Sequence, residues 1–298
     1  MTPTWSGLRW RVLGSSVTGV MHRRLGRPNQ DALLLPAADA ELPLLLAVAD
    51  GHGNSLSFRS DRGARLAVAT AQAICHWSLA TADPTNLAAF QCWTVEQLPR
   101  YLVSHWRQQV EQDFATYPFS LAEQRVRANS GYDFAYPYLA YGATLLAVMV
   151  TASFILYVQL GDGDILTISD DGQVRRPLPQ DVRLFDHMTT SLCTEEAWDC
   201  VRVAFQRLDE APPALILAAT DGCANSYQDD TGFLQLGSEL LSIFRAEGPG
   251  RVEQQLTGWL DHTSRAGSGD DITVGLLYRV DLAIQELADV ATATPAAR

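Results

Sequence analysis

The sequence contains no lysine, so all 22 of its basic residues are arginines. This absence excludes several enzyme classes, because a P-loop holds phosphates with a lysine, a Schiff-base enzyme needs an amine nucleophile, and a protein kinase needs its ATP-binding lysine. The 34 acidic residues outnumber the basic ones and give the 298-residue chain a formal net charge of −12. Nucleic acids and anionic membranes both reward clustered positive charge. We therefore expect neither of them as a partner.

Long apolar runs and paired cysteines are also missing. No run reaches the roughly 18 apolar residues of a membrane-spanning helix, and residues 1–10 lack the apolar core of a signal peptide. The five cysteines are an odd number without a CxxC pair, which is unlike a disulfide framework or a zinc knuckle. We expect a reduced, cytoplasmic protein. The 47% of hydrophobic residues is enough for one domain over residues 8–280, followed by a flexible tail over residues 281–298.

The chain contains both short apolar runs and segments in which apolar residues recur at helical spacing. The apolar runs predict strands over 44–49, 143–150, 154–160, 165–168, 201–208, 215–219 and 272–280. Apolar residues at helical spacing predict helices over 64–74, 95–114, 233–245 and 251–264. The continuous run 44–49 is typical of a strand buried on both faces, and the three runs between 143 and 168 indicate an antiparallel meander. The stretches 117–141 and 177–198 are irregular, and the second is a candidate surface flap.

Aspartates recur at the ends of these strands, and most of them stand beside a glycine. They are Asp31 in NQDA, Asp50 in DGHG, Asp162 in GDGD, Asp221 in TDG and Asp270 in DDIT. A neighbouring glycine lets a cation, a water or a phosphate approach the backbone closely. Oxygen ligands without a matching His/Cys set indicate Mg²⁺ or Mn²⁺ rather than zinc. Each Asp-Gly pair taken alone is also a common turn, so the argument for a site depends on their joint occurrence.

The ordered segments NQDA, LLLAVADGHG, GATLLAV, VQLGDGDIL, LILAATDG and GDDITVGLL resemble the metal-dependent protein serine/threonine phosphatases of the PP2C (PPM) type. The resemblance extends from Ser15 to Leu277, and the Gly19-x-x-His22 segment before NQDA is similar to a bacterial branch of that family. It implies an α+β fold, an αββα sandwich of two antiparallel sheets flanked by helices. It also implies a centre of two Mn²⁺ or Mg²⁺ ions, and in bacterial members a third, with hydrolysis of phosphoserine or phosphothreonine by a water held between the two ions.

The same resemblance assigns roles to the aspartates. Asp50 would bridge both ions, the carbonyl of Gly51 would bind one of them, and Asp221 and Asp270 would hold the other. Asp31 would lie close by and either orient metal-bound water or bind a metal ion through that water. In the segment that replaces the family's usual GDSR, Asp162 would help to bind the third ion.

The remaining roles concern the proton and the phosphate. His52, beside Asp50, matches the family's general acid, whereas the residues alone favour a turn histidine hydrogen-bonded to a carboxylate. The family's phosphate-binding arginine stands five residues before the first motif aspartate, where this chain has Gly26. Arg24 and Arg27 flank that position, and we expect one of them, with Arg27 favoured, to bind phosphate.

Two further acidic residues depart from the family pattern. Asp164 replaces the usual arginine and is either an extra metal contact or a hairpin-turn residue. Asp271 replaces a frequent asparagine and either contacts metal-bound water or caps the last strand.

Three functions are compatible with these observations. The leading one is a monomeric protein phosphatase whose partner is a phosphorylated protein, either a Ser/Thr kinase or a target of one. The second is a phosphatase-like regulatory or adaptor module with little activity, which the missing arginine at Gly26 favours. The third is a hydrolase of small phosphomonoesters, which could use the same metal site.

Overall fold

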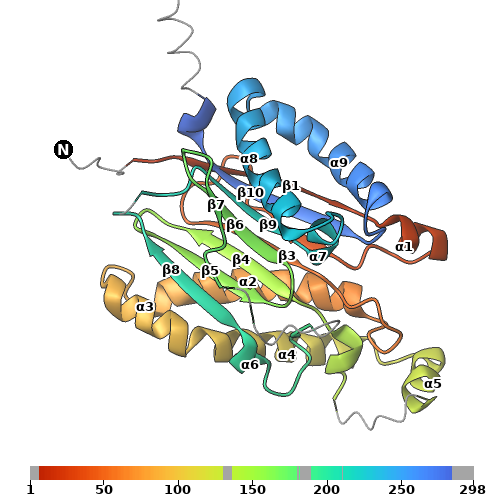
Figure 1. Cartoon of the computed structure of the whole chain (residues 1–298). Helices are drawn as coiled ribbons and strands as arrows, with labels where there is room; N and C mark the ends of the chain where they lie inside the picture. Colours follow the sequence, from red (N-terminus) through yellow and green to blue (C-terminus); the bar gives the residue numbers. More distant parts are fainter. Residues whose placement is uncertain (1–6, 130–135, 180, 182–188, 210, 284–298) are drawn as a thin grey trace, which may run out of the picture.

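Two antiparallel sheets lie face to face, and helices cover their outer faces (Figure 1). This computed structural model describes residues 7–129, 136–179, 181, 189–209 and 211–283. The layers follow one another as helices, sheet, sheet and helices (Figure 1), so the predicted αββα fold class is confirmed. The boundaries of the predicted domain, 8–280, stay a prediction. Most of the predicted tail, 284–298, lies outside the described residues, as do 130–135, 180, 182–188 and 210.

The first sheet has the strand order β2-β3-β4-β5-β8. Its strands are β2 (Ala32–Leu34), β3 (Leu44–Ala49), β4 (Leu145–Val150), β5 (Phe154–Leu160) and β8 (Arg202–Arg207). Helices α2 (Ser60–Thr81) and α3 (Leu87–Glu96) pack on it, and α4 (Leu98–Thr116) packs on these two helices.

The second sheet has the strand order β1-β10-β9-β6-β7. Its strands are β1 (Trp10–Val17), β6 (Asp164–Ile168), β7 (Val174–Arg175), β9 (Leu215–Ala219) and β10 (Ile272–Arg279). The helices α8 (Asp230–Glu247) and α9 (Pro249–Ala266) cover its outer face. Strand β1 runs along β10 with Trp10 opposite Arg279, so the first and last strands of the fold are neighbours.

The short elements connect these layers. They are α1 (Val20–Leu25), α5 (Leu121–Asn129), α6 (Ala197–Cys200), α7 (Asp221–Ala224) and two 3-10 turns, η1 (Tyr138–Tyr141) and η2 (Val280–Ala283). Over the described parts of residues 7–283, every helix is too short or too polar to cross a lipid bilayer.

The position of strand β3, buried on both faces, explains why its sequence is apolar throughout. Leu44, Leu46 and Val48 belong to the core between the two sheets. Leu45 and Ala47 point the other way, into the core under α2 and α4. Because successive side chains of a strand point to opposite faces, a strand covered on both faces needs apolar residues throughout. The prediction from the continuous run 44–49 is confirmed.

Two predictions about elements are wrong, those of a meander over 143–168 and of an irregular stretch over 117–141, which contains helix α5. The expected meander over 143–168 breaks at its last strand, because β6 pairs with β9 and β7 in the second sheet and not with β5. The chain crosses between the sheets at Gly161, whose φ of 107° is accessible mainly to glycine. The helix expected over 95–114 is confirmed as α4, but it begins at Leu98, because Pro99 lies in its first turn and a proline fits a helix start better than its interior.

Candidate metal centre

The five strand-end aspartates come together at one end of the sandwich. Asp31 immediately precedes β2, and Asp50 follows β3, its antiparallel neighbour. Asp162 lies in the turn that crosses from β5 to β6. Asp221 begins α7 after β9, and Asp270 lies just before β10, so antiparallel pairing puts both at the matching edge of the second sheet. Both sheets therefore contribute to the cluster.

These carboxylates lie close enough to change one another's pKa values. Burial raises the pKa values of Asp31 and Asp50 well above the usual range, and it also raises the pKa of Asp221. Neighbouring negative charges act in the same direction: Asp31, Asp221 and Asp270 on Asp50, and Asp162 and Asp270 on Asp221. Asp50 and Asp221 also lie close enough to share a proton.

The donor set fits a divalent cation. The charged groups that most affect Asp31, Asp50 and Asp221 are all carboxylates, and none of them is an arginine. Burying unpaired carboxylates is costly, so a cluster of this kind needs a cation. Oxygen atoms from several carboxylates are the ligands that Mg²⁺ and Mn²⁺ prefer.

Threonines that the sequence analysis did not single out hold the aspartates in place. The hydroxyls of Thr220 and Thr273 both donate to Asp31 Oδ2, at 2.8 and 2.7 Å. The backbone N–H of Asp50 donates to Thr144 Oγ1 at 2.9 Å. These threonines stand in the GAT, TDG and DDIT segments, so their place in the same segments that carry the resemblance was the available signal.

The DGHG turn is fixed by residues on both sides. The Asp50 carbonyl accepts from Thr144 N–H at 2.8 Å, and His52 N–H donates to the Gly142 carbonyl at 3.1 Å. Gly51, between them, faces Ala143 in an isolated antiparallel bridge. In such a pair the residue between two inter-strand bonds turns its own polar groups away from that partner. The Gly51 carbonyl therefore does not point at Ala143.

The His52 side chain is half-buried above Gly142. Burial lowers its pKa, and the Asp162 carboxylate acts against that change. Asp162 thus lies near His52 as well as near Asp221.

The two candidate phosphate-binding arginines differ in position. Arg27 Nη1 donates to the Gly53 carbonyl at 3.0 Å, so this guanidinium borders the DGHG turn. Arg24 is exposed in the last turn of α1. Gly26 is the C-cap of that helix, with a φ of 64° that an arginine would adopt only with strain. The local backbone thus explains why glycine stands where the family has its arginine.

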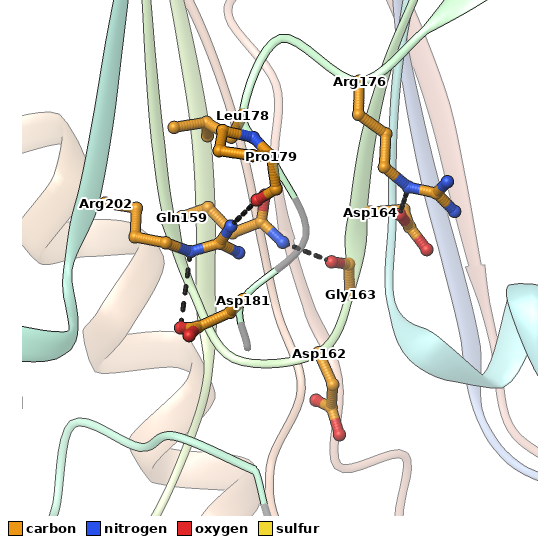
Figure 2. A pocket seen from close by; sticks show the side chains of 9 residues that line it. All are labelled: Gln159, Asp162, Gly163, Asp164, Arg176, Leu178, Pro179, Asp181 and Arg202. Carbon is orange, nitrogen blue, oxygen red and sulfur yellow. Dashed lines mark hydrogen bonds and ion pairs between the residues drawn. The ribbon is translucent and has the colours of Figure 1, made fainter. Parts of the chain in front are cut away.

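Asp164 has a partner that neither expectation named. Asp164 begins β6 and forms an ion pair with Arg176 (Figure 2). Arg176 also binds Asp230. Its charge is thus neutralised by an arginine, and it stays outside the carboxylate cluster. The pair lines a cavity of about 230 Å³ with Arg202, whose partners include Asp181.

Asp271 also forms contacts that neither expectation named. It is 4% exposed and accepts from the N–H groups of Gly19 and Gln30, at 2.6 and 2.7 Å, and contacts His22 Nδ1 at 2.8 Å. It joins the segment before NQDA to the start of β10. His22, like the three threonines, is a residue at this end of the sandwich to which the sequence motifs assigned no role.

Comparisons with known proteins agree with the fold and the motifs. Residues 18–261 match the family model described as protein phosphatase 2C. No curated protein matches the chain. Among solved structures, PppA, a regulatory component of T6SS in Pseudomonas aeruginosa, is 18% identical with a TM-score of 0.57 over 91% of this chain and 97% of its own.

Two other solved structures share the fold. The catalytic domain of the serine/threonine phosphatase PstP, in complex with 2 manganese ions, is 17% identical with a TM-score of 0.57 over 92% of this chain and 100% of its own. Stp1, a serine/threonine phosphatase from Staphylococcus aureus, is 12% identical with a TM-score of 0.52 over 91% of this chain and 94% of its own. The family match spans most of the sequence, and the chain therefore belongs to the protein phosphatase 2C family.

Proposed function

We propose that this protein is a metal-dependent phosphatase that hydrolyses phosphoserine and phosphothreonine in a partner protein. The observation that carries the proposal is the meeting of Asp31, Asp50 and Asp221 from both sheets. Asp221 raises the pKa of Asp31, both of them raise the pKa of Asp50, and no arginine is among the strongest charged neighbours of the three. Such a cluster is costly without a cation, and its retention supports a working metal site.

In this proposal Asp50 and the Gly51 carbonyl hold one Mn²⁺ or Mg²⁺ ion, and Asp50, Asp221 and Asp270 hold a second. Two such ions, when bound, activate water near neutral pH and neutralise charge on the phosphoryl oxygens. Asp31, fixed by two threonine hydroxyls, orients the nucleophile from the buried side. Asp162 contributes to a third, weaker ion site.

His52 and Arg27 serve the substrate. Burial lowers the pKa of His52, while Asp162 and a bound phosphate dianion both favour its protonated form, which can donate a proton to the leaving serine or threonine oxygen. Arg27 is held at the DGHG turn by the Gly53 carbonyl, and its remaining N–H groups can bind phosphoryl oxygens. Arg24 would need to turn from its exposed position to do the same.

The partner in this proposal is a phosphorylated protein, either a Ser/Thr kinase or its target, and the protein acts as a monomer. PstP and Stp1 are both serine/threonine phosphatases by description, which supports this substrate class.

The test is hydrolysis of p-nitrophenyl phosphate and of a phosphothreonine peptide with added Mn²⁺. We expect Asp50→Asn and Asp221→Asn to lower kcat at least about 100-fold, because removal of an electrostatic group from a catalytic site typically costs that much. Asp171→Asn is the matched control, since Asp171 also precedes a glycine but lies in an exposed turn. It should keep wild-type activity.

Other outcomes separate the remaining functions. Mn²⁺ binding without turnover of either substrate would favour the adaptor module. Faster hydrolysis of small esters than of folded phosphoproteins would favour the small-molecule hydrolase. Activity that survives Asp50→Asn would overturn the metal mechanism.

A further inference from the structure

A buried histidine stands at the edge of the carboxylate cluster without a role in the proposed chemistry. His22 lies in the short helix α1 and is only 8% exposed. Its backbone surroundings are anchored to the loop before β10, because Met21 N–H donates to the Gly269 carbonyl at 2.9 Å and Gly19 N–H donates to Asp271. The imidazole is therefore held against the segment that carries Asp270.

One ring nitrogen is fixed by a carboxylate. His22 Nδ1 lies 2.8 Å from Asp271 Oδ2, and Asp271 also accepts two backbone N–H groups. An ionised carboxylate only accepts hydrogen bonds, so Nδ1 is the nitrogen that carries a proton. In the neutral ring, Nε2 then presents a lone pair. A carboxylate that orients a histidine in this way is the usual outer partner of a metal-bound imidazole.

The other ring nitrogen faces Asp270. His22 Nε2 lies 3.8 Å from Asp270 Oδ1, which is too long for a hydrogen bond. Candidate ligand atoms of His22, Asp270 and Asp271 all lie within 4.8 Å of one another. Because a divalent ion binds nitrogen or oxygen at about 2.1 Å, one ion fits between two atoms separated by 3.8 Å.

A second buried atom on this side of the site lacks a partner. Gln30 is 9% exposed, and its Oε1 accepts no hydrogen bond from the described residues. A side-chain carbon at Gly53 would lie 3.7 Å from that oxygen and 4.0 Å from His22 Nε2, so both atoms face the DGHG turn. Two electron-rich atoms oriented toward the same place indicate that a cation or its water belongs there.

We propose that His22 Nε2 is a nitrogen ligand to the metal ion held by Asp270, with Asp271 as the residue that orients the imidazole. This inference rests on the metal centre of the proposed function and adds a ligand to it. Imidazole suits transition metals, whereas Mg²⁺ prefers oxygen ligands alone. A nitrogen ligand therefore makes the centre selective for Mn²⁺ over Mg²⁺.

The test measures the coordination and affinity of the metal ion, and it does not depend on phosphatase activity. The full-length protein is produced with ¹⁵N-histidine, loaded with Mn²⁺ and studied by electron spin-echo envelope modulation. We expect a ¹⁵N coupling in the wild type that persists in His52→Gln and is lost in His22→Gln. Calorimetry should show that His22→Gln weakens Mn²⁺ binding about tenfold or more and changes Mg²⁺ binding little.

Controls keep the two proposals apart. His262→Gln, at an exposed position of α9, should change neither the coupling nor the affinity. The wild-type spectrum is informative even where a variant misfolds. Bound Mn²⁺ without any ¹⁵N coupling, or a coupling lost in His52→Gln alone, overturns the assignment of His22 and leaves the proposed phosphatase intact. A wild-type protein that binds no Mn²⁺ overturns both.

Discussion

Individual hydroxyl groups decide how the carboxylate cluster is held. Asp31 is 8% exposed, and the hydrogen bonds from Thr220 and Thr273 lower its pKa against the larger effect of burial. Thr273 also contacts Ser16 Oγ at 2.7 Å, so this single threonine connects β1, the NQDA segment and β10. The orientation of Asp31 depends on these small side chains.

We expect Thr273→Val to destabilise the protein by about 1–3 kcal/mol, because it leaves a buried acceptor with one donor fewer. The pKa of Asp31 should rise further, and Mn²⁺ binding should weaken because the carboxylate is ionised less readily. Urea unfolding and Mn²⁺ titration measure the two effects. Thr257→Val removes an exposed hydroxyl pair with Ser15 and should change neither. Equal effects of both variants would contradict the role of Thr273.

At the scale of elements, helix α2 positions the DGHG region through one close contact. Gly63 lies so near η1 that a side-chain carbon there would be 1.7 Å from the Tyr141 carbonyl oxygen. Trp106 of α4 donates its indole N–H to the Gly63 carbonyl at 3.1 Å. The three elements therefore meet without space for a methyl group, next to the segment that carries Thr144.

We expect Gly63→Ala to destabilise the protein by about 1–3 kcal/mol or more, because the added carbon would have to displace backbone. Gly258→Ala is the matched variant in helix α9, where nothing lies within 4 Å of the new carbon. Since alanine favours a helix over glycine by about 1 kcal/mol, this second variant should stabilise the protein. Urea unfolding of both proteins checks the prediction, and two changes of the same sign would refute it.

The elements show what the sequence could predict. Strands such as β3 were predictable because both faces are buried, so every position is apolar. The transfer of β6 to the second sheet could not be predicted. A glycine turn has the same sequence pattern whether the next strand pairs in its own sheet or crosses to the other one. The strand-end aspartates could be predicted from their order. The contact of His22 with Asp271, 249 residues apart, depends on tertiary packing that no local pattern records.

At the scale of the whole molecule, two kinds of acidic group respond to pH with opposite sign. Asp31, Asp50 and Asp221 have raised pKa values, so folding favours their protonated forms. Their contribution to stability is present below the ordinary aspartate pKa and is lost as pH rises through the raised values. Glu123 is different, because the Arg59 guanidinium lowers its pKa to about 2. Its contribution to stability is present above the ordinary glutamate pKa and is lost as pH falls from there toward about 2.

We expect the metal-free protein, kept in EDTA, to lose stability as pH rises from about 4 toward about 8, since the clustered carboxylates then ionise without a counter-charge. Mn²⁺ at 100 times its Kd should add about 2.7 kcal/mol near neutral pH. It should add less at the acid end, where protons compete for the same oxygens. Thermal unfolding across this range measures both curves. Parallel curves would mean that the cluster does not hold the ion.

The pairing of β1 with β10 puts Trp10 directly opposite Arg279, which brings the two ends of the folded unit side by side. A short linker can therefore join them with little strain, as is common where termini lie close together. New ends opened in the exposed turn between β4 and β5, at residues Ala152 and Ser153, should leave intact the ten strands of the described residues. The order in which the chain is synthesised is then separable from its architecture, and the same unit can be inserted into a surface loop of another protein.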